Sequence, residues 1–226
     1  MGIVPGIFID RPNRFIANVW VNGERLAVHV KNTGRCKEIL ISGTRVFLEK
    51  ANEKSKRKTR FSLISAYKGS QLINIDSQIP NALVHSALEN QALNITGKMD
   101  YLKGEVTYQK SRFDLFYRSN HKKGFIEVKG VTLETKGVAL FPDAPTIRGT
   151  RHILELIDAS NQGYENYLIF VIQMKGVNCF KPNDKMDPNF SKALRAADKK
   201  GVYIQAYDCL VTNDTIKIDQ PVRVVL

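Results

Sequence analysis

The sequence has little cysteine, and its three cysteines are widely separated. Cys36, Cys179 and Cys209 form no Cys-x-x-Cys pair, which argues against a zinc knuckle. An odd, sparse set of cysteines is typical of a reducing cytosol rather than of secreted proteins. We therefore predict a cytoplasmic location.

The sequence also lacks a long hydrophobic run. Its longest apolar stretch, Tyr167–Ile172, is far too short to span a bilayer. The N-terminal stretch MGIVPGIFIDRPNRF shows no charged-then-apolar signal pattern. We therefore expect no membrane partner, and no motif indicates a small-molecule cofactor.

Acidic residues are scarce relative to basic ones. The chain has 34 Lys and Arg against 22 Asp and Glu, for a net charge of +12. The excess is uneven, because residues 1–78 hold 14 basic and 6 acidic residues while residues 79–226 hold 20 and 16. Such a surplus favours a polyanionic partner through counterion release, and we predict a nucleic acid.

Residues 1–78 have the pattern of an all-β unit. Short runs rich in Val, Ile, Phe and Trp alternate with turn signals, of which Asn22-Gly23 is a strong two-residue hairpin signal. The expected strands are 15–21, 26–31, 44–49, 61–67 and 71–75. This density of short strands predicts a small barrel or sandwich.

Much of the basic excess lies in one run, residues 50–60, before the fourth expected strand. Its cationic side chains include Lys54, Lys56, Arg57, Lys58 and Arg60. Such a run is either a solvated hairpin loop or a loop that grips phosphates beside the barrel. The sequence leaves both interpretations open.

Residues 79–226 change to a mixed helix and strand pattern, so we place a second domain there. Helices are expected over 79–93, from about 148 to 160, and from 187 to 201; strands are expected over 104–108, 167–174, 202–207 and 222–225. In the middle helix we expect Ile153 and Leu154 to face inward and Glu155 outward. The pattern predicts a mixed α/β domain.

A hairpin at the start of this domain carries an unusual set of charges. The apolar runs Phe113–Tyr117 and Phe125–Val131 flank a polar connection. Asp114 lies in the first run, and Glu127 and Lys129 share a face of the second because they are two residues apart. Buried charges are costly unless they are paired, hydrogen-bonded or bound to a metal.

These residue types suit phosphodiester hydrolysis. Magnesium takes oxygen ligands, and Asp114, Glu127 and the carbonyl of Val128 would supply them, with Lys129 near an attacking water. Glu105 is a candidate third carboxylate, although periodicity alone favours a strand residue that faces solvent. The simpler alternative is that Glu127 and Lys129 form a plain same-face salt bridge.

Five stretches of the chain resemble the sugar fermentation stimulation protein A (SfsA) family. They are HVKNTGR (29–35), SRFD (111–114), IEVKGVTL (126–133), FPDAPTIRGTRHILEL (141–156) and DPNFSKALRAADKKGVYIQAY (187–207). The resemblance implies an N-terminal OB-fold followed by a restriction-endonuclease-like α/β domain of the PD-(D/E)xK type. It also implies DNA binding linked to the regulation of sugar (maltose) metabolism genes.

Carried onto this chain, the resemblance marks Asp114, Glu127 and Lys129 as a nuclease-type triad, and Glu105 also matches a family position. In the HVKNTGR turn it makes Lys31, Asn32 and Arg35 candidate DNA contacts. The family's helix after the barrel often carries a Glu where this chain has Ser86, so only Glu89, one turn on, would substitute for it.

Three functions remain open from the sequence. The protein is a DNA-binding regulator, or a metal-dependent DNA endonuclease, or a binder of RNA or single strands through its barrel. The last would stack bases on barrel aromatics, for which Phe15, Trp20, Phe47 and Phe61 are the candidates.

Overall fold

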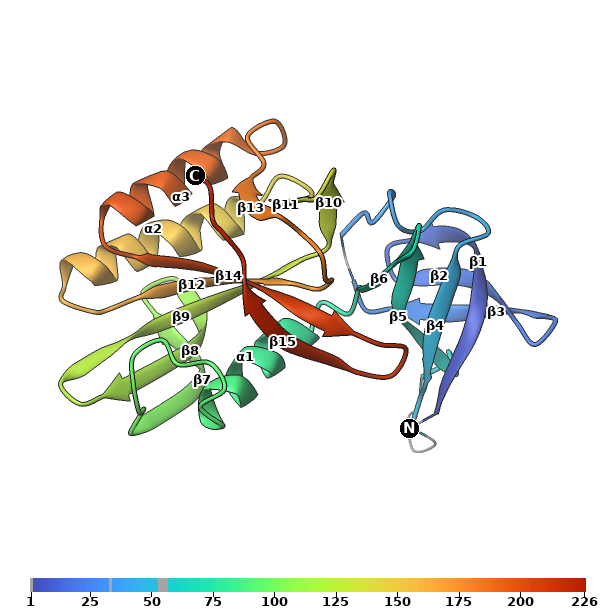
Figure 1. Ribbon diagram of the computed structural model, residues 1–226, viewed down its shortest axis with the longest axis horizontal. Coiled ribbons are helices and arrows are strands. Elements are labelled where there is room, and N and C mark those ends of the chain that lie inside the picture. The colour runs from blue at the N-terminus through green and yellow to red at the C-terminus, as the bar shows by residue number, and fades with distance from the viewer. Residues whose placement is uncertain (1, 33, 53–56) are drawn as a thin grey trace.

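The computed structural model describes residues 2–32, 34–52 and 57–226. The chain forms a β-barrel and an α/β domain that lie side by side (Figure 1). The barrel's last strand ends at Asn74, and the first helix of the α/β domain begins at Ile79.

Within the described residues the barrel has six strands. They are β1 (Ile3–Asn13), β2 (Ile16–Val21), β3 (Glu24–Val30), β4 (Arg45–Lys50), β5 (Phe61–Lys68) and β6 (Gln71–Asn74). The sheet order is β3-β2-β1-β4-β5-β6, and a parallel pairing of β3 with β5 closes the barrel. Asn22 and Gly23 have the positive φ angles of the predicted β2–β3 hairpin turn. The predicted small barrel is confirmed.

The α/β domain is built on a second six-stranded sheet. Its strands are β7 (Tyr101–Tyr108), β8 (Ser111–Ser119), β9 (Lys122–Val131), β12 (Tyr167–Ile172), β14 (Tyr203–Val211) and β15 (Ile216–Pro221), in the order β15-β14-β12-β9-β8-β7. The central strands β9, β12 and β14 are parallel. A smaller sheet, β10 (Leu133–Thr135), β11 (Val138–Phe141) and β13 (Cys179–Pro182), lies toward the barrel (Figure 1).

Three helices of the described chain cover the two faces of the large sheet. Helix α1 (Ile79–Glu89) covers one face, and α2 (Ile147–Asn161) and α3 (Pro188–Lys199) cover the other (Figure 1). The side chains of Thr146 and Asp187 cap the N-termini of α2 and α3. Across the described residues, no helix is both long and apolar enough to cross a membrane.

The structure contains five strands that were not predicted, β1, β10, β11, β13 and β15, and the strand predicted last is misplaced. Strand β1 was not expected, because Pro5 and Gly6 are residue types that are depleted from strand interiors. The expected strand 222–225 is wrong, since β15 ends at Pro221 and only Val224 beyond it makes a bridge, to Phe180. The valine-rich sequence there misled the prediction.

The orientation predicted for α2 is also partly wrong. Leu154 is 54% exposed, whereas Glu155 is buried and accepts a hydrogen bond from the Ser111 amide at 2.9 Å. A buried carboxylate with an amide partner is stable on the inner face of a helix. Helical period alone could not reveal that partner, which lies 44 residues earlier in the chain.

Candidate functional site

The predicted charged hairpin lies where strands β8 and β9 separate. Their last paired residues on this side are Leu115 and Ile126, while β9 continues alongside β12. Asp114 and Glu127 lie directly beyond that last pair, and the amide of Val128 donates to Asp114 Oδ2 at 2.7 Å. The Asp114 carboxylate thus accepts a hydrogen bond from a backbone amide of β9 beyond the last residue pair of β8 and β9.

Asp114 also marks a change in the face that β8 presents to the core. The ring centres of Phe113 and Phe125 are 5.0 Å apart, and both rings lie on the face of the sheet that α2 and α3 cover. Leu115 lies on the opposite face, which α1 covers. Residues two apart in a regular strand share a face. The alternation breaks at Asp114, whose Oδ1 accepts from Asn81 Nδ2 of α1 at 2.6 Å.

Glu127 is buried, and its two carboxylate oxygens differ in their hydrogen-bond partners. Oε1 accepts from Lys129 Nζ and lies 2.5 Å from His152 Nδ1 on α2. Within the described residues, Oε2 is buried without a hydrogen-bond partner. A buried carboxylate oxygen without a donor is costly, and such an atom in a native fold calls for a ligand or another explanation.

The pKa values of the two carboxyl groups are shifted in opposite directions. Burial and the facing Glu127 carboxylate raise the pKa of Asp114 to about 6. Burial would also raise the pKa of Glu127, but Lys129 and His152 outweigh it and hold that pKa below its usual value. Opposed shifts in neighbouring carboxyl groups are common at functional sites.

The arrangement fits a hard divalent cation. Both donors of Glu127 are gathered on Oε1, so Oε2 and the Asp114 carboxylate are the oxygens that would hold it. No three His, Cys, Asp or Glu side chains of the described chain converge as a metal cage. Magnesium is usually held by only one or two protein carboxylates, so two suffice.

The other two predicted carboxylates, Glu105 and Glu89, do not lie with Asp114 and Glu127. Glu105 has φ of 56° and is exposed, and it pairs with Arg112 at 3.1 Å on the surface. On α1, Glu89 pairs instead with His85. The polar residue that α1 supplies to the site is Asn81.

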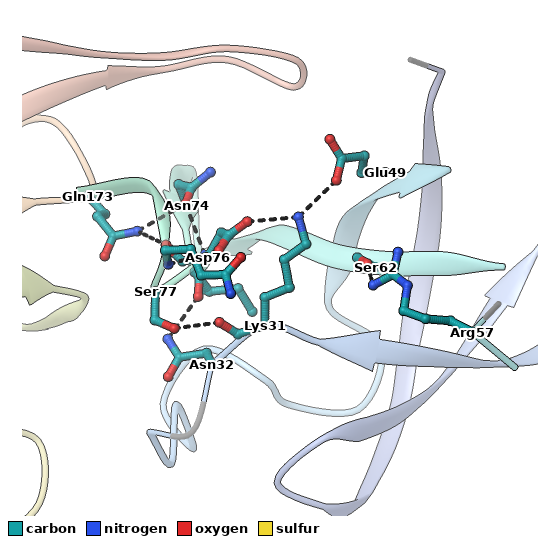
Figure 2. Close-up of polar contacts among 11 residues, drawn as sticks. Lys31, Asn32, Glu49, Arg57, Ser62, Asn74, Asp76, Ser77 and Gln173 are labelled. Carbon is teal, nitrogen blue, oxygen red and sulfur yellow. Dashed lines mark hydrogen bonds and ion pairs between the residues drawn. The ribbon is translucent and has the colours of Figure 1, made fainter. Parts of the chain in front are cut away.

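Lys31 and Asn32 of the HVKNTGR stretch lie near the junction between the barrel and the α/β domain (Figure 2). Lys31 Nζ contacts Glu49 at 2.9 Å and Asp76 at 3.1 Å, so its ammonium is engaged by two carboxylates. Asn32 Nδ2 donates to the Ile75 carbonyl at 2.8 Å. The Arg35 amide donates to an Asp143 carboxylate oxygen at 3.2 Å. Their predicted contacts with DNA stay predictions.

Gln173, at the end of β12, links the chain before α1 to the large sheet. Its Nε2 donates to Asn74 Oδ1 and to the Asp76 carbonyl, each at 3.0 Å (Figure 2). Its backbone carbonyl accepts from the Asn74 amide at 2.9 Å. The end of the barrel is therefore tied to β12, which pairs with β9, the strand of Glu127 and Lys129.

The predicted phosphate-gripping loop is only partly described. Lys54 and Lys56 lie outside the described residues. Arg57, Lys58 and Arg60 are exposed, and Arg57 Nη1 donates to Ser62 Oγ at 3.2 Å. The loop therefore presents cationic side chains to solvent from the barrel.

The barrel aromatics divide into exposed and enclosed rings. Phe15 and Trp20 are 45% and 47% exposed, and the Arg14 guanidinium lies 4.8 Å from the Phe15 ring centre. Phe47 is buried and Phe61 is half-buried against the core. Of the four candidates, Phe15 and Trp20 are the exposed rings.

Two residues of the site were not anticipated: Asn81 and His152. The signal for His152 was present, since it lies four residues before Leu156 on the inner face of an amphipathic helix. A polar residue at such a position needs a partner, and that partner is Glu127. Asn81 carried no signal, because its contact depends on how α1 meets the sheet.

Comparisons with known proteins cover nearly the whole chain. A family model described as "Sugar fermentation stimulation protein RE domain" matches residues 78–215, and one described as "SfsA N-terminal OB domain" matches residues 9–75. A sugar fermentation stimulation protein homolog of Alkaliphilus oremlandii is 52% identical, covering 95% of this chain and 93% of its own length. A Clostridium botulinum homolog is also 52% identical, covering 98% and 96%.

A solved structure has the same fold. It is described as the structure of Pyrococcus furiosus SfsA in complex with Ca²⁺, and it superimposes with a TM-score of 0.90 at 27% sequence identity. The match covers 100% of this chain and 96% of that one. The predicted OB-fold barrel followed by a mixed α/β domain is thereby confirmed.

Proposed function

Because the chain belongs to the sugar fermentation stimulation protein (SfsA) family, we propose that it binds double-stranded DNA and holds a divalent cation at Asp114 and Glu127. The observation that carries this proposal is the buried Glu127 Oε2, which has no hydrogen-bond partner among the described residues. A nucleic acid with its phosphates near such a cation site gains a sequence-independent contact.

Charge supports DNA as the partner. The net charge of +12 favours a polyanion, and Arg57, Lys58 and Arg60 supply exposed cations on the barrel. Contacts of this kind grip phosphates and carry no sequence information. We extend the family's implied role, regulation of sugar metabolism genes, to this protein as part of the same proposal.

The donor set supports a hard cation. The Pyrococcus furiosus relative was solved with Ca²⁺, and carboxylate oxygens are the ligands that Ca²⁺ and Mg²⁺ prefer. A bound cation would supply positive charge to a phosphate and acidify a water. The protein's part is to orient the oxygens: Asn81 and Val128 fix Asp114, and His152 and Lys129 fix Glu127.

Binding to duplex DNA tests the proposal. Fluorescence anisotropy of a labelled duplex, followed from about 50 to 200 mM salt, should give a steep linear fall of log affinity with log salt. Affinities that do not change with salt would exclude a phosphate-based interaction. A single strand of the same length tests the barrel alternative, for which Phe15 and Trp20 are the exposed rings.

Metal-dependent cleavage of DNA is the second candidate function. The observation that favours it is Lys129, whose ammonium contacts Glu127 beside Asp114. A lysine so placed would stabilise or deprotonate an attacking water at the cation. DNA binding without cleavage would leave Lys129 as a counter-charge to the two carboxylates.

Plasmid cleavage separates the two candidates. Purified protein and an Asp114→Ala variant are incubated with supercoiled, linear and single-stranded DNA in Mg²⁺ or Mn²⁺. Metal-dependent nicking that disappears in the variant supports an endonuclease. Intact DNA with both proteins supports binding without hydrolysis.

A further inference from the structure

Arg148 lies near the carboxylate of Glu127 but was not among the predicted site residues. It is an exposed residue in the first turn of α2, and its Nε donates to His152 Nε2 at 3.3 Å. The other nitrogen of that imidazole, Nδ1, lies 2.5 Å from Glu127 Oε1. One imidazole ring therefore separates the Arg148 guanidinium from the Glu127 carboxylate.

The contact with Arg148 sets the hydrogen-bonding role of His152. Arg148 Nε can only donate, so His152 Nε2 must accept. In a neutral imidazole the proton then lies on Nδ1, which donates to Glu127 Oε1. This pattern leaves Glu127 Oε2 open and holds the guanidinium beside the site.

The rest of the Arg148 guanidinium is available to an anion. Only Nε is used by His152, and no salt bridge is assigned to Arg148 within the described part of the chain. By contrast, Arg112 and Arg195 of the same domain each pair with a carboxylate. An exposed guanidinium with free N–H groups matches two oxygens of a phosphate in its planar fork.

We propose that Arg148 binds a phosphate of DNA at the Asp114–Glu127 site, and that His152 is the residue that positions it. The inference rests on the proposed function, because it assigns one contact of the proposed DNA complex. Arg148 is exposed, whereas His152 and Glu127 are buried, so the guanidinium lies on the solvent side of the imidazole that contacts Glu127. A backbone phosphate that approaches Glu127 from this side therefore meets Arg148.

Arg151 is a matched control. It is exposed on the same helix and carries the same charge. Together with Leu154 and Asn189 it lines a separate groove of about 330 Å³. Arg151 therefore lies away from the contact between Arg148 and His152. Replacing either arginine with alanine therefore changes the net charge equally.

The test measures the affinity of a labelled duplex in Ca²⁺ for wild type, Arg148→Ala, Arg148→Lys and Arg151→Ala at several salt concentrations. Arg148→Ala should weaken binding about tenfold and lower the salt slope by about 0.9, the value of one phosphate contact. Arg148→Lys should recover part of the affinity, because it keeps the charge but loses the planar fork. Arg151→Ala should remain within about twofold of wild type.

A calcium titration of each protein without DNA gives a second readout. Arg148→Ala should bind Ca²⁺ as wild type does, whereas His152→Leu should bind it about tenfold more weakly, because Glu127 loses a donor. His152→Asn, whose amide can replace Nδ1–H, should recover the Ca²⁺ affinity and still bind DNA like Arg148→Ala. Wild-type DNA affinity in His152→Asn would remove His152 as the residue that positions Arg148.

The outcomes separate this inference from the proposed function. If wild type binds duplex DNA and Arg148→Ala matches Arg151→Ala in affinity and slope, the inference is wrong and the proposed function stands. If wild type binds no duplex DNA, both are wrong. Circular dichroism and thermal unfolding identify any variant that loses the fold.

Discussion

In the barrel, Arg57, Lys58 and Arg60 are exposed to solvent, whereas in the α/β domain Glu127 is 2% exposed and its Oε1 accepts from Lys129 and His152. Exposed charges act through their number and are screened by salt. Buried charges act through geometry, because each must have a partner. In the proposed function, the exposed cations of the barrel hold the polyanion, and the buried charges of the sheet act at one point along it.

The largest effect should come from removing a buried carboxylate. Asp114→Ala takes away one of the two proposed carboxylate ligands, so Ca²⁺ affinity should fall by about 100-fold or more, beyond what loss of an orienting partner costs. Isothermal titration calorimetry measures it. Glu105→Ala is the control and should bind Ca²⁺ normally, because Glu105 pairs with Arg112 on the surface. Equal losses in both variants would contradict the assigned cation site.

Removing the exposed charges of the barrel should change DNA affinity and leave Ca²⁺ affinity unchanged. Replacing Arg57, Lys58 and Arg60 together by alanine should weaken binding of all duplex sequences by about tenfold or more and lower the salt slope by about 0.9 per lost contact. Calcium affinity should not change. Anisotropy with two unrelated duplexes measures both quantities, and an unchanged duplex affinity would assign the loop to solvent.

The contrast between the regions extends to what the sequence could predict. The barrel and the charged hairpin were predictable, because two-residue alternation and turn signals are local. The same-face placement of Glu127 and Lys129 followed from spacing alone. The face change between Phe113 and Leu115 did not, since it depends on where β8 separates from β9.

Partners distant in sequence limited the site prediction further. The sequence did not reveal that Lys31 pairs with Asp76, which follows the last strand of the barrel. His152 and Glu127 are 25 residues apart and belong to a helix and a strand. Spacing within one element cannot reveal contacts between elements, which only tertiary packing creates.

The junction between the two regions offers a stability test. A Cβ on Gly130 would lie 2.6 Å from Gln173 Oε1 and 2.8 Å from Pro80 Cγ. Gly130→Ala should therefore lower the free energy of unfolding by about 1–3 kcal/mol, as overpacked sites do. Chemical denaturation measures it. Gly104→Ala, whose nearest atom would be 3.9 Å away, is the control. If Gly130→Ala is as stable as wild type, the junction accommodates a methyl group and the prediction is wrong.

The smallest effect should come from the ion pair that joins the barrel to β10. Lys68 Nζ lies 2.6 Å from Glu134 Oε2. Burial would raise the pKa of Glu134, but the Lys68 ammonium and the Gly137 amide hold it below its ordinary 4.5. A lowered folded-state pKa means that this stabilisation is complete above pH 4.5 and is lost as the pH falls through the folded value.

Glu134→Gln removes the titrating group and should lower the free energy of unfolding at pH 7 by about 1 kcal/mol. The difference between variant and wild type should shrink as the pH falls below 4.5. Denaturation at pH 7 and in acid measures both. A difference that stays constant with pH would show that Glu134 contributes without its charge.

The response of DNA binding to calcium tests the central claim most directly. Duplex affinity is measured by anisotropy for wild type and Asp114→Ala, each in Ca²⁺ and in a chelator at one ionic strength. We predict that Ca²⁺ tightens duplex binding by wild type and leaves duplex binding by Asp114→Ala unchanged. Equal affinities of wild type with and without Ca²⁺, or an equal response of Asp114→Ala, would contradict it.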